Sequence, residues 1–138
     1  MLFRSLKDSA ASDGLIYGLT VGRGLGGVST NSAFGVGALA ANTTGTTNTA
    51  IGYNALLLNT FANNNTAIGS NTLSATTTGG NNTAVGDSSL RANTIGFGNT
   101  SIGSAAMYGN LTGYNNVAIG LQALYTGTTS AKIGRAHV

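Results

Sequence analysis

Residues 48–56 read NTAIGYNAL, and residues 65–73 repeat this stretch as NTAIGSNTL. Related segments begin at residues 82 and 116, as NTAVGDSSL and NVAIGLQAL, and more divergent ones begin at residues 31 and 99. The opening asparagines are spaced by 17 residues throughout: Asn31, Asn48, Asn65, Asn82, Asn99 and Asn116. A fixed period of this length indicates a repeat architecture in which each copy forms one structural unit.

Each copy is numbered here with its opening asparagine as position 1. Position 5 is always glycine: Gly35, Gly52, Gly69, Gly86, Gly103 and Gly120. Position 4 is large and apolar: Phe34, Ile51, Ile68, Val85, Ile102 and Ile119. Position 9 is leucine or methionine: Leu39, Leu56, Leu73, Leu90, Met107 and Leu124. Positions 3 and 8 are small, so the unit reads N-T-A-I-G-x-x-A-L-x-x-N-T-T-G-x-N.

This pattern predicts an all-β fold. Apolar positions 4 and 9 lie five residues apart and glycine interrupts every copy, which fits no helical template. The unit instead fits one 17-residue rung of a parallel β-solenoid or β-roll, with short strands at N-T-A-I and A-L joined by Gly/Asn/Thr turns. Glycine at position 5 is expected at a corner that needs a positive φ or close backbone approach. The position-1 asparagines are expected to stack as an amide ladder.

Both predicted strands are apolar on their two faces. Because side chains alternate along a strand, positions 3 and 4 should point to opposite sides, and so should positions 8 and 9. One face can fill the coil interior and the other then needs a partner, so we expect several chains to associate. No segment is expected to cap either end of the coil. An aspartate introduced at Ile68 should bury an unpaired charge.

The composition removes most kinds of site chemistry. Asp and Glu together number 3, all of them aspartate, and the chain has Cys 0 and His 1. Disulfides, thiolate metal sites and most pairs of nucleophile and general base are therefore excluded. We expect no catalytic, cofactor-binding or metal site, and a protein that is not an enzyme. No apolar run reaches the length of a membrane helix, so no membrane insertion is expected.

The two ends are expected to be foreign to the repeat protein. KIGRAHV at 132–138 can be encoded by AAG ATC GGA AGA GCA CAC GTC, and MLFRS at 1–5 by the reverse complement of DNA within that string. Both resemble one sequencing-library adapter, translated once on each strand, and are set aside from fold reasoning. The expected organisation is an artefact at 1–5, a lead-in β segment at 6–30, six repeats at 31–132, and an artefact at 133–138 with Lys132 at the junction. The stretch between the artefacts is expected to be a piece of a longer protein.

The formal net charge of +3 comes from these ends. Between them, three cations balance three aspartates: Lys7, Arg23 and Arg91 against Asp8, Asp13 and Asp87. The basic balance therefore gives no reason to expect a nucleic-acid partner.

The repeats resemble two kinds of surface fibre. NTAIGYNAL, NTAIGSNTL, NTAVGDSSL and NVAIGLQAL are similar to the head repeats of YadA-like trimeric autotransporter adhesins, and still more to the Asn/Thr/Gly-rich repeats of bacteriophage tail fibres. The lead-in IYGLTVGRGLGGVSTNSAFG at 16–35 is similar to the segment before such repeats, and the resemblance covers about residues 14 to 132. It implies a homotrimer on a virion tail or a bacterial cell surface, with self as partner and a host surface glycan or protein as receptor. The adhesin heads imply a left-handed parallel β-roll.

Other motifs have simpler readings. GRGLGG at 22–27 fits G-x-G-x-x-G, but no helix pattern or downstream acidic residue follows, so a Gly-rich turn into the first rung is expected. Only Asp87 lies in the repeats, which excludes a calcium β-roll. Tyr108 and Tyr125 share position 10 one rung apart, and are expected to stack on the surface with receptor binding as the minor reading.

Three function classes remain at this point. The main prediction is a structural or adhesive segment of a trimeric fibre, of the tail-fibre shaft kind first and the autotransporter head kind second. An ice-binding solenoid is a minor alternative, because threonines recur at positions 2 and 13, although N-T-T replaces the paired T-x-T columns usual in such proteins. An enzyme whose catalytic part lies outside this segment is the third.

Overall fold

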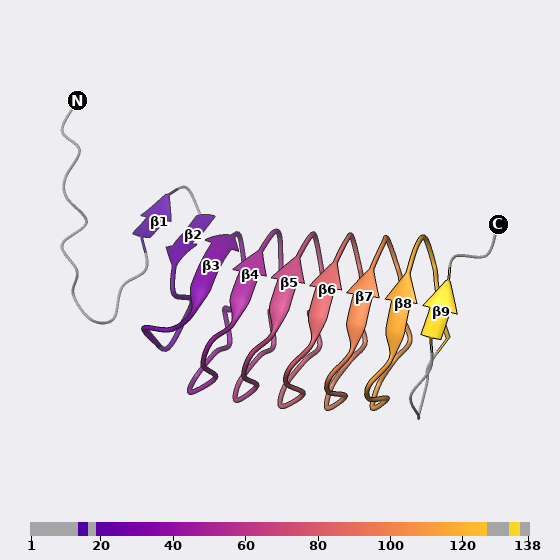
Figure 1. Ribbon diagram of the computed structural model, residues 1–138. Helices are drawn as coiled ribbons and strands as arrows, with labels where there is room; N and C mark the ends of the chain where they lie inside the picture. The colour runs from indigo at the N-terminus through magenta and orange to yellow at the C-terminus, as the bar shows by residue number, and fades with distance from the viewer. Residues whose placement is uncertain (1–13, 17–18, 127–132, 136–138) are drawn as a thin grey trace.

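The computed structural model describes residues 14–16, 19–126 and 133–135 of the 138-residue chain. Within them the fold is all-β, without a helix, and the chain winds as a parallel solenoid of about five turns (Figure 1). Nine strands form one sheet in sequence order. They are β1 (Gly14–Ile16), β2 (Leu19–Gly22), β3 (Ser32–Gly35), β4 (Thr49–Ile51), β5 (Thr66–Ile68), β6 (Thr83–Val85), β7 (Thr100–Ile102), β8 (Val117–Ile119) and β9 (Ile133–Arg135).

The register of the sheet reproduces the sequence repeat. Ala50 pairs with Ala67 and Ile51 with Ile68, and the same 17-residue offset relates every neighbouring pair from β3 to β8. Each repeat position therefore forms a column along the rod. β9 continues the parallel sheet at an offset of 16, with Ile133 opposite Val117. The 1–5 and 136–138 parts of the expected artefacts lie outside the described residues.

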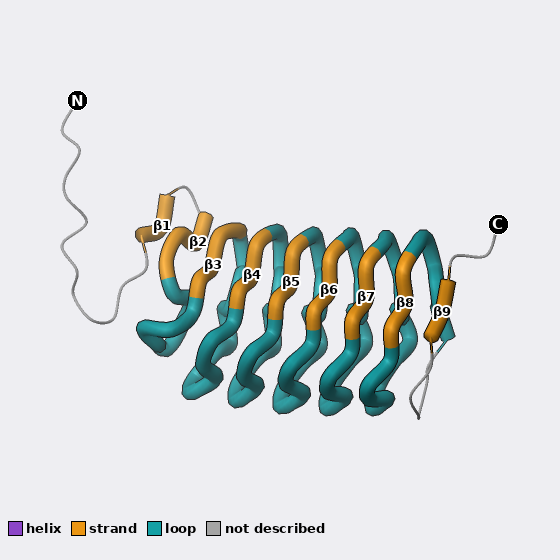
Figure 2. The backbone as a smooth tube through the Cα atoms, viewed as in Figure 1, coloured by secondary structure: helices purple, strands orange, loops and turns teal. Residues whose placement is uncertain are grey.

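The prediction of a second strand at A-L is wrong. One strand per rung is present, and positions 8 and 9 lie in turns (Figure 2). Leu56 has φ 51° and Leu73 φ 50°, in the left-handed region that leucine seldom adopts. The expected alternation of positions 8 and 9 fails for the same reason: the turn directs both Ala55 and Leu56 inward, and each is 0% exposed.

The turn segment still bonds from rung to rung. The Leu56 N–H donates to the Thr72 carbonyl at 3.1 Å, and the Leu58 N–H donates to the Ser74 carbonyl at 3.1 Å. This segment forms the wall opposite the strand, and we call it the turn wall, positions 8–11 of each rung. Rung stacking thus satisfies its backbone without extended geometry.

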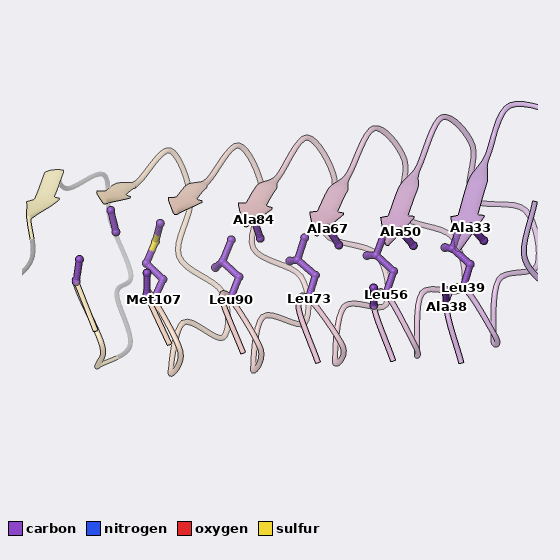
Figure 3. Packing of buried hydrophobic residues seen from close by; sticks show 14 residues of the cluster. Ala33, Ala38, Leu39, Ala50, Leu56, Ala67, Leu73, Ala84, Leu90 and Met107 are labelled. Carbon is purple, nitrogen blue, oxygen red and sulfur yellow. The ribbon is translucent and has the colours of Figure 1, made fainter. Parts of the chain in front are cut away.

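The core is a single line of small and large side chains. Strand alanines such as Ala50 and Ala67 point toward Leu56 and Leu73 from the turn wall (Figure 3). Ile68 at position 4 lies on the outside of the sheet and is 37% exposed. The expectation that an aspartate at Ile68 buries a charge is therefore wrong for a single chain, because position 3 rather than position 4 fills the interior.

The expectation of an uncapped coil is also wrong at the N-terminal end. β1 and β2 form an antiparallel hairpin, and β2 pairs antiparallel with β3, so the first rung does not present a bare edge. The Gly-rich loop then crosses the first rung, where the Leu25 N–H donates to the Leu39 carbonyl at 3.1 Å. At Gly26 (φ +87°) a Cβ would lie 2.8 Å from the Asn42 and Thr43 carbonyl oxygens. The GRGLGG motif thus serves close backbone approach.

The position-5 glycines mark the corner after each strand. Gly86 has φ +127°, and a Cβ there would lie 2.7 Å from the carbonyl carbon and oxygen of Gly103 in the next rung. Both the backbone conformation and the rung spacing therefore require glycine at this position.

We expect Gly86→Ala to lower the free energy of unfolding by about 2 kcal/mol or more, because it combines an unfavourable φ with a backbone clash. Urea unfolding followed by circular dichroism measures the change. The matched control is Gly109→Ala, at position 11, where Ala41, Ala75 and Ala92 stand in other rungs. The control should be neutral or stabilising by up to about 1 kcal/mol. Equal losses in the two variants would contradict this account of the corner.

Candidate functional site

The six predicted position-1 asparagines form one buried column. Their exposed fractions run from 0% to 5%. The Asn65 N–H donates to Asn48 Oδ1 at 3.0 Å, and the Asn82 N–H donates to Asn65 Oδ1 at 2.9 Å. In the later rungs the side-chain amide also donates along the column, as from Asn99 Nδ2 to Asn82 Oδ1 at 3.0 Å. From Asn31 to Asn99, each amide oxygen thus ties one rung to the next, whereas Asn116 Oδ1 has no partner within the described residues.

The same amides close each rung on itself. Asn65 Nδ2 donates to the Gly79 carbonyl at 2.8 Å, and Asn82 Nδ2 donates to the Gly96 carbonyl at 2.9 Å. From Asn31 to Asn99 the acceptor is at position 15, on the loop that returns to the next strand. A single buried side chain therefore fixes both the closure and the stacking of the rung.

A second buried ladder at position 12 was missed in the sequence reasoning. Asn59 Nδ2 donates to Asn42 Oδ1 at 2.9 Å, and Asn110 Nδ2 donates to Asn93 Oδ1 at 2.9 Å. The recurring asparagine of N-T-T in the repeat unit was the available signal. Position 12 directly follows the turn wall, and its side chain is buried because the chain turns inward there.

Thr76 interrupts this second ladder. It is 0% exposed, and its hydroxyl donates to the Asn93 carbonyl at 3.1 Å instead of back to the preceding rung. Within the described residues, the buried Asn59 Oδ1 consequently has no hydrogen-bond partner. A buried unpartnered acceptor costs stability.

The outer face of the strands is an apolar and hydroxyl surface. We call it the strand face, positions 2 and 4 of β3–β8. Position 2 is mostly threonine, and position 4 carries the exposed Phe34, Ile51, Ile68, Ile102 and Ile119. No charged residue occupies these positions from β3 to β8. An aligned apolar column without charge is typical of a surface that packs against protein.

Two aromatic pairs lie elsewhere on the rod. Tyr108 and Tyr125 at position 10 stack with ring centroids 5.2 Å apart and an interplanar angle of 10°. Phe97 and Tyr114 at position 16 stack with centroids 5.2 Å apart. The predicted stacking of Tyr108 on Tyr125 is therefore present, and a second pair accompanies it.

The threonine columns do not form the paired T-x-T array of ice-binding solenoids. At position 13, the hydroxyls of Thr43 and Thr60 donate to backbone carbonyls of the next rung, at 2.8 Å and 3.2 Å. On the strand face, threonine at position 2 is next to Ile at position 4. The geometry therefore gives no specific support to the ice-binding alternative.

The described residues contain no group of three or more His, Cys, Asp or Glu side chains placed to hold a metal ion. A helix of membrane-spanning length and hydropathy is also absent from the described part of the chain. Comparisons with protein-family models, with curated proteins and with solved structures find no match.

We expect Asn82→Ala to lower the free energy of unfolding by about 2–5 kcal/mol, because the Asn99 N–H and Nδ2 both lose their buried acceptor. Equilibrium urea unfolding measures this change. Thr78→Ala, at the exposed position 14 of the rung before, is the control and should change stability by about 0.5 kcal/mol or less. A loss for Asn82→Ala no larger than that of the control would show that the ladder contributes nothing.

We expect Thr76→Asn to raise the free energy of unfolding by about 1 kcal/mol, since an asparagine there can donate to Asn59 Oδ1 as Asn59 donates to Asn42. The same denaturation experiment applies. Thr78→Asn adds an identical side chain outside the ladder and should be neutral. If Thr76→Asn is neutral or destabilising, the unpartnered Asn59 Oδ1 does not limit the stability of this rung.

Proposed function

We propose that the chain is a non-enzymatic structural and adhesive segment of a homotrimeric surface fibre, of the kind found in phage tail-fibre shafts. The observation that carries the proposal is the strand face. It runs the length of β3–β8 with an apolar side chain at position 4 of every rung; five of the six are exposed, Val85 is half-buried, and Ile119 at the end is 54% exposed. A single chain gains nothing from exposing this column in each repeat, whereas a partner chain would bury it.

Self-association suits this surface because the column is periodic. Strands in neighbouring rungs are spaced by about 4.8 Å in any parallel sheet, so identical copies present apolar side chains at the same intervals. Three copies around an axis parallel to the rod can bring their position-4 columns together layer by layer. The absence of charge from this column in β3–β8 removes the repulsion that identical chains would otherwise feel.

Two settings fit such a fibre. The proposed location is a virion tail, with a bacterial cell surface as the alternative through the autotransporter-like repeats. Both need a stiff spacer whose length grows with the number of rungs, and the position-1 column of buried amides supplies stiffness along the rod. The neighbouring genes distinguish the settings: tail or baseplate genes indicate a phage, and an anchor-barrel domain downstream indicates an autotransporter.

In sedimentation equilibrium we expect the full chain to have three times its monomer mass of 13.6 kDa. Ile68→Asp should convert it to monomer, because three carboxylates would be brought together in an apolar interface. The isolated coil of this variant should stay folded, since Ile68 is already 37% exposed in one chain.

Asp87→Asn at the exposed position 6 is the control and should leave the trimer intact. A wild-type chain that remains monomeric and folded at high concentration would overturn the homotrimer. A trimer unaffected by Ile68→Asp would place the interface on another face.

A further inference from the structure

We infer that Arg91, Tyr108 and Tyr125 form a binding site for a carboxylate-bearing sugar. The three residues occupy position 10 of consecutive rungs, so the solenoid places them in one column, here called the position-10 column. Arg91 Nη1 donates to the Tyr108 hydroxyl at 2.7 Å, and its guanidinium carbon lies 5.6 Å from the centre of the Tyr108 ring. Tyr108 in turn stacks on Tyr125.

The column holds its cation in place and leaves it accessible. Tyr108 fixes the guanidinium by a hydrogen bond and by a cation–π contact, which reduces the freedom that a ligand would have to remove. Arg91 is exposed, and within the described part of the chain it has no carboxylate partner. Guanidinium presents five N–H donors in a planar fork, and one is used here.

A carboxylate is the ligand that this geometry favours. Two parallel N–H donors of guanidinium match the two oxygens of a carboxylate, and such charge-assisted pairs are the stronger hydrogen bonds of proteins. Asp87, the other charged residue within residues 31–126, sits at position 6 and does not belong to this column. The site is therefore cationic on a nearly uncharged rod.

The tyrosines favour a sugar as the carrier of that carboxylate. Tyr125 is 44% exposed at the end of the stack, so part of its ring is open to a ligand. A pyranose ring presents C–H groups on its flat side, which pair with the negative face of an aromatic ring. The tyrosine hydroxyl group can donate to and accept from sugar hydroxyls.

The fold itself does not require these side chains. The same position is Ala40, Leu57 and Ser74 in the first three rungs, and these rungs have the same strand register and the same positive φ at position 9 as the later ones. The column is thus a local departure from a repeat that folds without it. Substitution at these positions can test binding without breaking the coil.

The inference rests on the proposed adhesive function, which it deepens by naming a ligand class. Position 10 belongs to the turn wall, opposite the strand face across the core (Figure 3). A trimer assembled through the strand face leaves the position-10 column open to ligand. The two proposals can therefore fail separately.

The test is titration calorimetry of the full chain with trigalacturonate and with its methyl ester, which keeps the rings and removes the charge. We expect the acid to bind roughly ten- to a hundredfold more tightly than the ester. Arg91→Ser, which copies the third rung, should abolish that difference, and Tyr125→Leu, which copies Leu57, should weaken both probes. Tyr114→Asn, which copies Asn63 at position 16, removes the other aromatic pair and should leave binding unchanged.

Circular dichroism of each variant verifies that the coil is intact. Failure of the wild-type chain to bind trigalacturonate would overturn the inference, as would equal affinity for acid and ester or no effect of Arg91→Ser. Equal binding of a tri-aspartate peptide would show a general anion site and overturn the sugar assignment. Sedimentation of the same samples separates the two proposals. A monomer that binds the acid would overturn only the homotrimer proposal, and a trimer that does not bind it would overturn only the sugar-site inference.

Discussion

Every rung has to close on itself and stack on its neighbour within the same 17 residues, and the buried amide at position 1 meets both demands. In Asn65, Nδ2 bonds the position-15 carbonyl of its own rung at 2.8 Å, and Oδ1 accepts the N–H of the next rung's Asn82 at 2.9 Å. An aspartate would lack the donor. Because one side chain serves both contacts, an inserted or deleted residue would break one of them, which accounts for a spacing without exception.

This constraint leaves a narrow interior, so a polar residue placed there needs a hydrogen-bond partner. Ser101 stands at the position-3 alanine site and Ser89 at the position-8 site of the preceding rung, and their hydroxyls bond each other at 2.7 Å. Thr72, also at position 8, donates its hydroxyl to the Gly86 carbonyl at 2.6 Å. Small polar residues are thus tolerated in the core where a neighbouring rung satisfies them, and Asn59 Oδ1 marks the place where Thr76 does not.

Much of the fold follows from the sequence, since spacing gives the register and the T-A-I segment gives the strand. Two features do not follow. Asn64 and Asn81 have positive φ, as turn propensities suggest. Leu73 also has positive φ, although leucine disfavours this backbone conformation, because burial of its side chain outweighs the backbone cost. The choice between positions 3 and 4 for the interior also depends on the width of the coil. Opposite leucines fill that width, so only a small residue such as alanine or serine fits beneath the strand, and alternation alone could not indicate this.

The positions that the coil does not constrain are where one rung differs from another. Position 10 changes from Ala40 to Tyr125 along the rod, and position 16 from Thr46 to Tyr114, while positions 1 and 5 never change. Both stacked aromatic pairs of the described residues lie between 97 and 125, so the two ends of the rod present different surfaces on one backbone. A repeat selected only for length would have no reason to differentiate in this way. The invariant columns therefore hold the rungs together, and the variable positions can change from rung to rung without altering the coil.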